Sequence, residues 1–370
     1  VYKRQVEDVN GHRSLCLDGR PLTGDGFEVR SIVGQVGERV VVTGSTEPTE
    51  IHLAEVALDG SGTNQITSEP GVHGAVLAGD TMVVSASRPD VPGTRITVGL
   101  DGPVIADHSA APVITARPSF HGHGAELRSA LFLPSDHDGI TPLPVLLDPY
   151  GGPHAQRVLK AHNPHLVSQW FADQGYAVVV TDGRGTPGRG AEFERAVWGD
   201  LAQPVLDDQL TALDRLAERT GLLDLDRVAI RGWSFGGYLA ALAVLRRPDR
   251  VHAAIAGAPV TSWALYDTHY TERYLGHPAT HPDHYERCNL ISEAHELTRP
   301  LLLIHGLADD NVVAAHTLRF STALLATGSA HQVLPLSGVT HMTPQLAVAE
   351  NLLRLQLDFL DRTVGESAAP

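Results

Sequence analysis

Two patterns of hydrophobic and polar residues divide the chain near residue 113. Before that point, short apolar runs rich in β-branched residues alternate with turns of Gly, Asp and Asn, in residues 37–62 and again in residues 79–102. Groups of four short strands that recur roughly every 40 residues are typical of β-propeller blades. Residues 1–113 are therefore expected to hold about two blades, with remnants of further strands before Phe27.

Residues 114–370 show short buried-type runs rich in Val, Ile and Leu that alternate with helical patterns. This alternation predicts an α/β domain, a doubly wound and mostly parallel sheet with helices on both faces. The expected strands are residues 142–148, 175–182, 227–232, 252–259, 299–306 and 331–338. The expected helices are residues 164–174, 204–220, 236–247, 314–328 and 342–362.

The start of the chain at Val1 has neither an initiator Met nor an apolar signal core. Two blades are too few to close a propeller ring, so we interpret the sequence as a C-terminal fragment with a truncated propeller. Only Cys16 and Cys288 are present, which cannot form a disulfide framework. This composition favours a reducing compartment such as the cytoplasm, while the truncated start leaves an upstream signal peptide open.

Charge and apolar length exclude several partners. The net charge of -15 disfavours nucleic acid, whose phosphates it would repel. No apolar stretch is long enough to cross a bilayer, so no membrane span is expected. The Gly-rich residues 182–190 lack the Lys-Ser/Thr of a phosphate loop, and the His-rich residues 277–284 lack zinc spacing. We therefore expect no metal.

Ser234 lies between Gly232 and Gly236, where an expected strand meets an expected helix. Glycines at these positions let strand and helix approach closely around a strained turn that exposes the serine hydroxyl, as in the nucleophile elbow of α/β-hydrolases. A Gly-rich turn with an incidental serine is the alternative. The strand before and the helix after favour the nucleophile.

A nucleophilic serine needs a base, and the base needs an acid that orients it. In this fold the chain order is Ser, then Asp or Glu, then His. Asp309 or Asp310 follows an expected strand, and His341 lies in the loop before the last helix. Three other histidines occupy a strand end, a helix and a strand start and fit structural roles better: His305, His316 and His331.

Four segments carry a family resemblance: "PYGGP" (residues 149–153), "GWSFGGY" (232–238), "YDTHYTERYLG" (266–276) and "HGLADDNV" (305–312). In these segments the chain resembles the prolyl oligopeptidase family of serine peptidases, above all its dipeptidyl peptidase IV branch. The likeness extends over residues 115–362. It implies an α/β-hydrolase domain preceded by the last blades of a β-propeller, and catalysis without a cofactor.

The resemblance also implies roles for the residues around Ser234. It identifies Asp309 as the acid that orients His341, and it leaves Asp310 a structural role. The oxyanion donors would be the Tyr150 hydroxyl and the backbone N–H of Phe235. Phe235 stands where the branch usually has tyrosine, which removes a hydroxyl near the site but keeps the backbone donor.

A substrate pocket follows from the same resemblance. Without the resemblance, a valine and three aromatic residues near helical spacing, in residues 260–270, would more often belong to the core than to a binding wall. In the branch that the chain resembles, such residues surround the side chain just before the scissile bond, and Asn311 matches an amide that binds a substrate carbonyl. Flat aromatic walls suit a pyrrolidine ring, so cleavage after proline or alanine is expected. The implied pocket residues are Val260, Trp263, Tyr266, Tyr270 and Val312.

The expected function is a serine peptidase that acts on peptides and releases N-terminal dipeptides. The branch binds the free amino terminus through a glutamate pair in upstream blades, and residues 1–113 contain no identifiable counterpart. An acylaminoacyl peptidase or oligopeptidase with the same triad is the first alternative. An inactive binding relative is the second, and an esterase fits less well. The oligomeric state is not readable from the sequence, although relatives of this family commonly dimerise and a homodimer is compatible with the resemblance.

Overall fold

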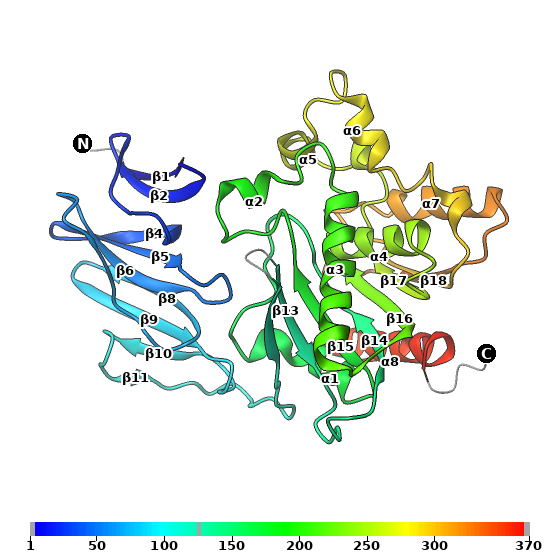
Figure 1. Cartoon of the computed structure of the whole chain (residues 1–370), viewed down its shortest axis with the longest axis horizontal. Helices are drawn as coiled ribbons and strands as arrows, with labels where there is room; N and C mark the ends of the chain where they lie inside the picture. The colour runs from blue at the N-terminus through cyan, green and yellow to red at the C-terminus, as the bar shows by residue number, and fades with distance from the viewer. Residues whose placement is uncertain (1–3, 124–126, 366–370) are drawn as a thin grey trace.

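The computed structural model describes residues 4–123 and 127–365, and its N-terminal part consists of three antiparallel sheets (Figure 1). A three-stranded sheet holds β1 (Arg4–Val9), β2 (His12–Leu17) and β3 (Arg20–Pro21). A four-stranded sheet follows, with β4 (Glu28–Val36), β5 (Arg39–Ser45), β6 (His52–Ala57) and β7 (Thr63–Gln65). A second one holds β8 (Val72–Ala78), β9 (Thr81–Ser87), β10 (Arg95–Val98) and β11 (Val104–Ile105). The four-stranded sheets are the last propeller blades, and each takes up one of the two recurring sequence patterns.

An eight-stranded sheet forms the centre of the C-terminal part, in the order β12-β13-β15-β14-β16-β17-β18-β19. Its strands are β12 (Ser119–His123), β13 (Leu127–Phe132), β14 (Leu143–Leu147), β15 (Ala177–Asp182), β16 (Leu223–Trp233), β17 (Ala253–Gly257), β18 (Leu301–Gly306) and β19 (Gln332–Leu336). Neighbours from β15 to β19 pair in parallel, whereas β12 and β13 pair antiparallel. The edge strand β12 and its neighbour β13 were not anticipated, because Gly, His and charged residues interrupt the apolar pattern of residues 119–132.

Helices cover both faces of this sheet, as expected for an α/β-hydrolase fold. One face carries α3 (Gln203–Thr220), α4 (Phe235–Arg246) and α7 (Ala315–Ala326). The other carries α1 (Leu166–Ala172) and α8 (Leu346–Thr363). Three short helices lie outside the predicted set: α2 (Ala191–Arg195), α5 (Thr268–Leu275) and α6 (Pro282–Arg287). Among the described residues, none of the helices combines the length and the apolar character needed to span a membrane.

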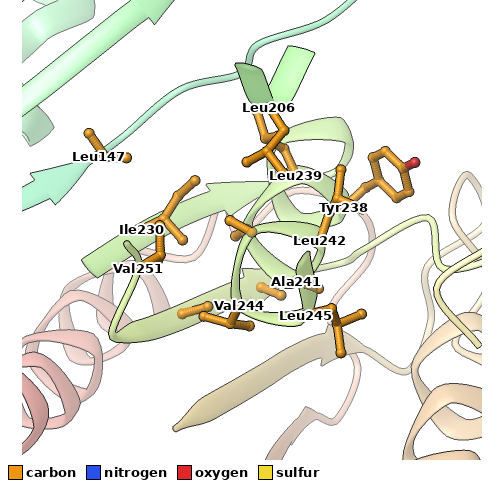
Figure 2. Packing of buried hydrophobic residues seen from close by; sticks show 14 of the residues in the cluster. Leu147, Leu206, Ile230, Tyr238, Leu239, Ala241, Leu242, Val244, Leu245 and Val251 are labelled. Atoms are coloured by element: carbon orange, nitrogen blue, oxygen red, sulfur yellow. The ribbon is translucent and has the colours of Figure 1, made fainter. Parts of the chain in front are cut away.

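The α4 helix is buried along nearly its whole length. Every residue from Phe235 to Leu245 is buried, and a helix that is apolar on all sides belongs in a protein interior. Its side chains pack against β16 and α3, with Leu206, Ile230 and Leu239 in one cluster (Figure 2). Each such leucine or isoleucine contributes about 1.5–3 kcal/mol through burial. The N-terminus of α4 is therefore a rigid platform.

Polar contacts join the propeller sheets to the hydrolase part. The Arg128 guanidinium pairs with Glu47 at 2.9 Å, and Lys160 and Arg13 pair with Glu50 and Glu194. The apolar clusters of the described residues each stay on one side of this contact. The domain boundary at residue 113 stays a prediction, and it falls between the end of β11 and the start of β12.

Candidate active site

The backbone at Ser234 has the geometry of a strained turn between β16 and α4. Its φ of 60° and ψ of -117° place a residue with a side chain in a region that favours glycine. A Cβ atom at Gly232 would lie 2.2 Å from the carbonyl carbon of Gly236, and one at Gly236 would lie 2.6 Å from the Pro149 oxygen. Only glycine fits these two positions, so the sequence pattern around Ser234 follows from close backbone packing.

Asp309 and His341 form the hydrogen bond expected of an acid and a base in a triad. His341 Nδ1 and Asp309 Oδ2 are 2.7 Å apart. The other carboxylate oxygen of Asp309 accepts the backbone N–H groups of Asn311 and Val312, each at 2.9 Å. Asp309 is buried, whereas Asp310 is exposed. The geometry therefore favours Asp309 over its neighbour as the partner of His341.

The loop that carries His341 is held by two features that the sequence analysis missed. The indole N–H of Trp233 donates to the His341 carbonyl oxygen at 2.8 Å. At the end of β18, a Cβ on Gly306 would lie 2.5 Å from the carbonyl oxygens of Val339 and Thr340, so the loop packs directly on this glycine. In the sequence, only the position of Trp233 beside Ser234 hints at this hydrogen bond, because its partner His341 lies 108 residues further along the chain.

The competing histidines have other partners. His305 contacts Thr317 Oγ1 through Nδ1 and the Val312 carbonyl oxygen through Nε2, both at 2.7 Å. The ring of His331 lies 2.7 Å from the Ser321 hydroxyl. His316 is buried in α7, and this burial lowers its pKa to about 4. The contacts of His305 and His331 and the burial of His316 fit structural roles.

The two expected oxyanion donors lie beside Ser234. The Tyr150 hydroxyl interacts with the Ser234 hydroxyl, and burial raises the pKa of Tyr150 to about 12, so it keeps its proton at neutral pH. Phe235 is the first residue of α4, where a backbone N–H lies outside the helical hydrogen-bond ladder. The Phe235 ring packs 5.8 Å from the Tyr150 ring. A Cβ on Gly152 would lie 2.3 Å from the Phe235 ring. The Tyr150 loop thus rests on the residue that follows Ser234.

The expected pocket residues gather next to these donors. The Trp263 and Tyr270 rings stack 5.9 Å apart at 9°, and Tyr266 meets both of them edge-on. The Tyr266 hydroxyl donates to Asn311 Oδ1 at 3.1 Å. Val260 and Val312 are buried in the same apolar cluster. Val260, Trp263 and Val312 thus lie in the core, as the alternative interpretation of this segment expected, and the half-buried Tyr266 and Tyr270 form an aromatic wall over them.

His154 is a further residue of this region that the sequence analysis did not single out. It directly follows the "PYGGP" segment and has a positive φ of 76°. Its ring lies 4.9 Å from that of Tyr270, and its Nε2 is 3.3 Å from the Tyr274 hydroxyl. Burial, with a smaller effect of Arg273, lowers its pKa. His154 thus connects the Tyr150 loop to the aromatic wall.

A metal centre has no counterpart in residues 4–123 and 127–365, where no group of three or more His, Cys, Asp or Glu side chains could hold an ion. What the described residues offer is a strained serine, a hydrogen-bonded Asp309–His341 pair, the two residues expected as oxyanion donors and an aromatic wall. An acyl-transfer site needs groups of these kinds.

The fold and this arrangement define an α/β-hydrolase that follows propeller blades. A family model described as the prolyl oligopeptidase family matches residues 163–367. The chain belongs to this family.

Some curated relatives of the chain are named dipeptidyl peptidases, and others are named prolyl endopeptidases. The chain is 41% identical to human dipeptidyl peptidase 8 over 218 residues, which is 57% of this chain and 24% of that protein. It is 35% identical to mouse prolyl endopeptidase FAP over 198 residues, 53% of this chain and 26% of that protein. The chain thus spans about a quarter of the length of these relatives.

Solved structures show the same fold over nearly the whole chain. A dipeptidyl peptidase 4 from Porphyromonas gingivalis matches with a TM-score of 0.89 at 24% identity, covering 98% of this chain and 54% of that one. A protein described as a putative dipeptidyl aminopeptidase IV from Bacteroides ovatus matches with a TM-score of 0.85 at 23% identity, covering 98% and 57%. These similarities establish the propeller-plus-hydrolase architecture.

Proposed function

We propose that the protein is a serine peptidase that hydrolyses peptide bonds after proline, accepts alanine, and releases N-terminal dipeptides. The observation that carries this proposal is the 2.7 Å hydrogen bond between Asp309 and His341, in a loop that Trp233 ties to the strained Ser234. Family membership supports the reaction class.

In the proposed reaction, the Ser234 oxygen attacks the substrate carbonyl while His341 takes the hydroxyl proton. Asp309 stabilises the imidazolium that forms. The Tyr150 hydroxyl and the Phe235 N–H stabilise the negative charge on the substrate oxygen. His341 then gives its proton to the leaving amine. A water molecule attacks the acyl-enzyme by the reverse proton transfers and restores Ser234.

The aromatic wall supports the preference for proline. A pyrrolidine ring buries apolar surface against flat side chains without requiring hydrogen bonds. The half-buried rings of Tyr266 and Tyr270 offer such surface, and the buried Trp263 ring stacks behind Tyr270. Asn311 would bind the preceding carbonyl through its side-chain amide, which the Tyr266 hydroxyl orients. The aromatic side chains would thus favour a compact ring just before the scissile bond, and Asn311 would hold the peptide backbone that precedes it.

The release of dipeptides is supported by the relatives named dipeptidyl peptidases, whereas other relatives are named prolyl endopeptidases. An acylaminoacyl peptidase or oligopeptidase would use the same triad and differ in its demand for a free amino terminus. Substrates with a free or an acetylated amino terminus separate these two kinds of peptidase. An inactive relative would keep the scaffold and turn over neither substrate.

The test uses the protein expressed from its whole natural reading frame. A fluorophosphonate probe should label the wild type and the control Ser61→Ala, an exposed turn serine, but not Ser234→Ala. The wild type should cleave Gly-Pro-arylamide at least tenfold faster than its acetylated form. Labelling of Ser234→Ala would contradict the mechanism. Equal cleavage of the blocked substrate would favour the oligopeptidase alternative.

The proposal includes a homodimer. Membership in the prolyl oligopeptidase family supports it. Sedimentation of the protein expressed from its whole natural reading frame should give twice the monomer mass, and a monomer mass would contradict the proposed dimer.

A further inference from the structure

A charged network lies beneath the Tyr150 loop, at the carboxyl ends of three neighbouring strands. Asp182 ends β15, Asp148 directly follows β14, and Arg231 lies near the end of β16. These strands are adjacent in the order β15-β14-β16, and the register places Leu147 opposite Ile230. Asp148 and Arg231 are therefore neighbours across the sheet.

Arg157 closes the base of the loop that begins at Asp148. Its Nη1 donates to the Asp148 carbonyl oxygen at 2.6 Å, and its Nη2 donates to Asp148 Oδ2 at 3.1 Å. The backbone N–H groups of Arg157 and Val158 donate to the Asp182 carboxylate at 2.7–3.1 Å. Both ends of the segment that contains Tyr150 are thus fixed to the sheet.

Arg231 joins this base to the strand of Ser234. Its Nη1 lies 3.3 Å from Asp148 Oδ1, and its Nε donates to Gln356 of α8 at 3.1 Å. The guanidinium also lies 4.5 Å above the Phe171 ring of α1. Helices on one face of the sheet therefore hold the Arg231 side chain in one orientation.

The Asp148 carboxylate is ionised in this position. Burial alone would raise its pKa, but the guanidinium groups of Arg157 and Arg231 hold it below the ordinary value. Asp148 is 2% exposed, and Ser168 Oγ donates a further hydrogen bond at 2.8 Å. A buried ion pair adds little net stability compared with apolar packing, while it restricts the geometry of the groups that it joins. The network is therefore better explained by geometry than by stability.

The residues that the network joins are close in sequence to the proposed reacting groups. Tyr150 lies two residues after Asp148, and Ser234 lies three residues after Arg231. We infer that Arg231, acting through Asp148, is a positioning residue that sets the Tyr150 hydroxyl at the oxyanion site beside Ser234. This inference rests on the proposed function.

Loss of the Arg231–Asp148 contact should affect the transition state of the reaction rather than the binding of substrate. The charge on the substrate oxygen develops in the transition state, so a misplaced Tyr150 hydroxyl lowers kcat and leaves KM nearly unchanged. It also weakens a prolyl boronic acid, whose tetrahedral adduct with Ser234 places an oxygen at the same site. A product-like peptide that forms no tetrahedral adduct keeps its affinity.

The experiment is a double-mutant cycle between Arg231→Met and Tyr150→Phe in the protein expressed from its whole natural reading frame. We expect Arg231→Met to lower kcat about tenfold, and Arg231→Lys, which keeps the charge, to lower it less. In the Tyr150→Phe background, Arg231→Met should lower kcat less than twofold further, because the positioned hydroxyl is already absent. The matched control is Arg227→Met on the same strand, whose side chain pairs locally with Asp224.

A full tenfold loss in the Tyr150→Phe background would overturn the inference, as would a rise in KM with kcat unchanged. Absence of Ser234-dependent turnover in the parent protein would instead reject the proposed function. If Arg231→Met does not fold, Arg231→Lys is taken through the same cycle, since it loses the planar contact that joins Asp148 and Gln356.

Discussion

The indole N–H of Trp233 donates a 2.8 Å hydrogen bond to the carbonyl oxygen of His341. Trp233 directly precedes Ser234, so one residue connects the loop of the base to the strand of the nucleophile. The Trp233 ring also covers Gly257, where a Cβ would lie 2.0 Å from it. The distance between base and nucleophile therefore depends on an aromatic side chain that belongs to neither.

Replacing Trp233 by Phe tests this relationship. The variant keeps an aromatic ring over Gly257 and removes the N–H group that holds His341. A neutral hydrogen bond contributes about 1 kcal/mol, so kcat/KM for Gly-Pro-arylamide should fall by about fivefold to tenfold. Trp198→Phe is the control, because Trp198 is 55% exposed and contacts His281 and His284 instead. Equal losses in both variants would argue against the positioning role.

Asp309 and Asp310 offer an internal comparison. Asp309→Asn keeps the size of the side chain but removes the charge that orients His341, so kcat should fall by about 10³–10⁴. Asp310→Asn changes an exposed neighbour and should leave kcat within about twofold, as for an ordinary surface substitution. Steady-state kinetics of both variants decide the assignment, and comparable losses would mean that the acid is not Asp309.

The strained turn makes Gly232 sensitive to any side chain. In Gly232→Ala the new methyl group would meet the Gly236 backbone at 2.2 Å, which forces the turn that carries Ser234 to shift. We expect activity to fall at least tenfold and stability to fall by about 1–3 kcal/mol. Gly24→Ala is matched, since a Cβ there meets nothing within 4 Å. Urea unfolding and probe labelling measure the two effects, and an active, equally stable Gly232→Ala protein would contradict them.

Acid sensitivity should come in part from His165. It is buried beside Phe132, and burial lowers its pKa from 6.5 to about 4. The unfolded chain binds this proton first as the pH falls, so folding stability is lost between pH 6.5 and about pH 4. The loss amounts to roughly 3 kcal/mol.

His165→Gln keeps a donor for the Leu159 carbonyl oxygen and removes the titrating ring. Its urea midpoint should depend less steeply on pH over that window than the midpoint of the parent protein. Val313→Ala, an uncharged change at an exposed position, should keep the parental slope. An unchanged slope in His165→Gln would show that other groups dominate.

Much of the fold could be predicted because its signals are local. The runs around Val179, Ile230 and Leu303 each have at least three consecutive apolar residues at a buried centre, and each was placed within a few residues of its observed strand. The strands at residues 119–132 were missed because Gly, His and charged residues interrupt their apolar pattern, although β13 is buried between β12 and β15.

The candidate site divides in the same way. The sequence alone determined the strained Gly-x-Ser-x-Gly turn and the order of Ser234, the two aspartates and His341, because backbone sterics and chain order are properties of short segments. Only the tertiary structure decided that Asp309 rather than Asp310 contacts His341, that Trp233 holds the base, and that Arg231 reaches Asp148. These contacts join residues on different strands and loops. Sheet order and side-chain direction select such partners, and neither is written in the periodicity of any one segment.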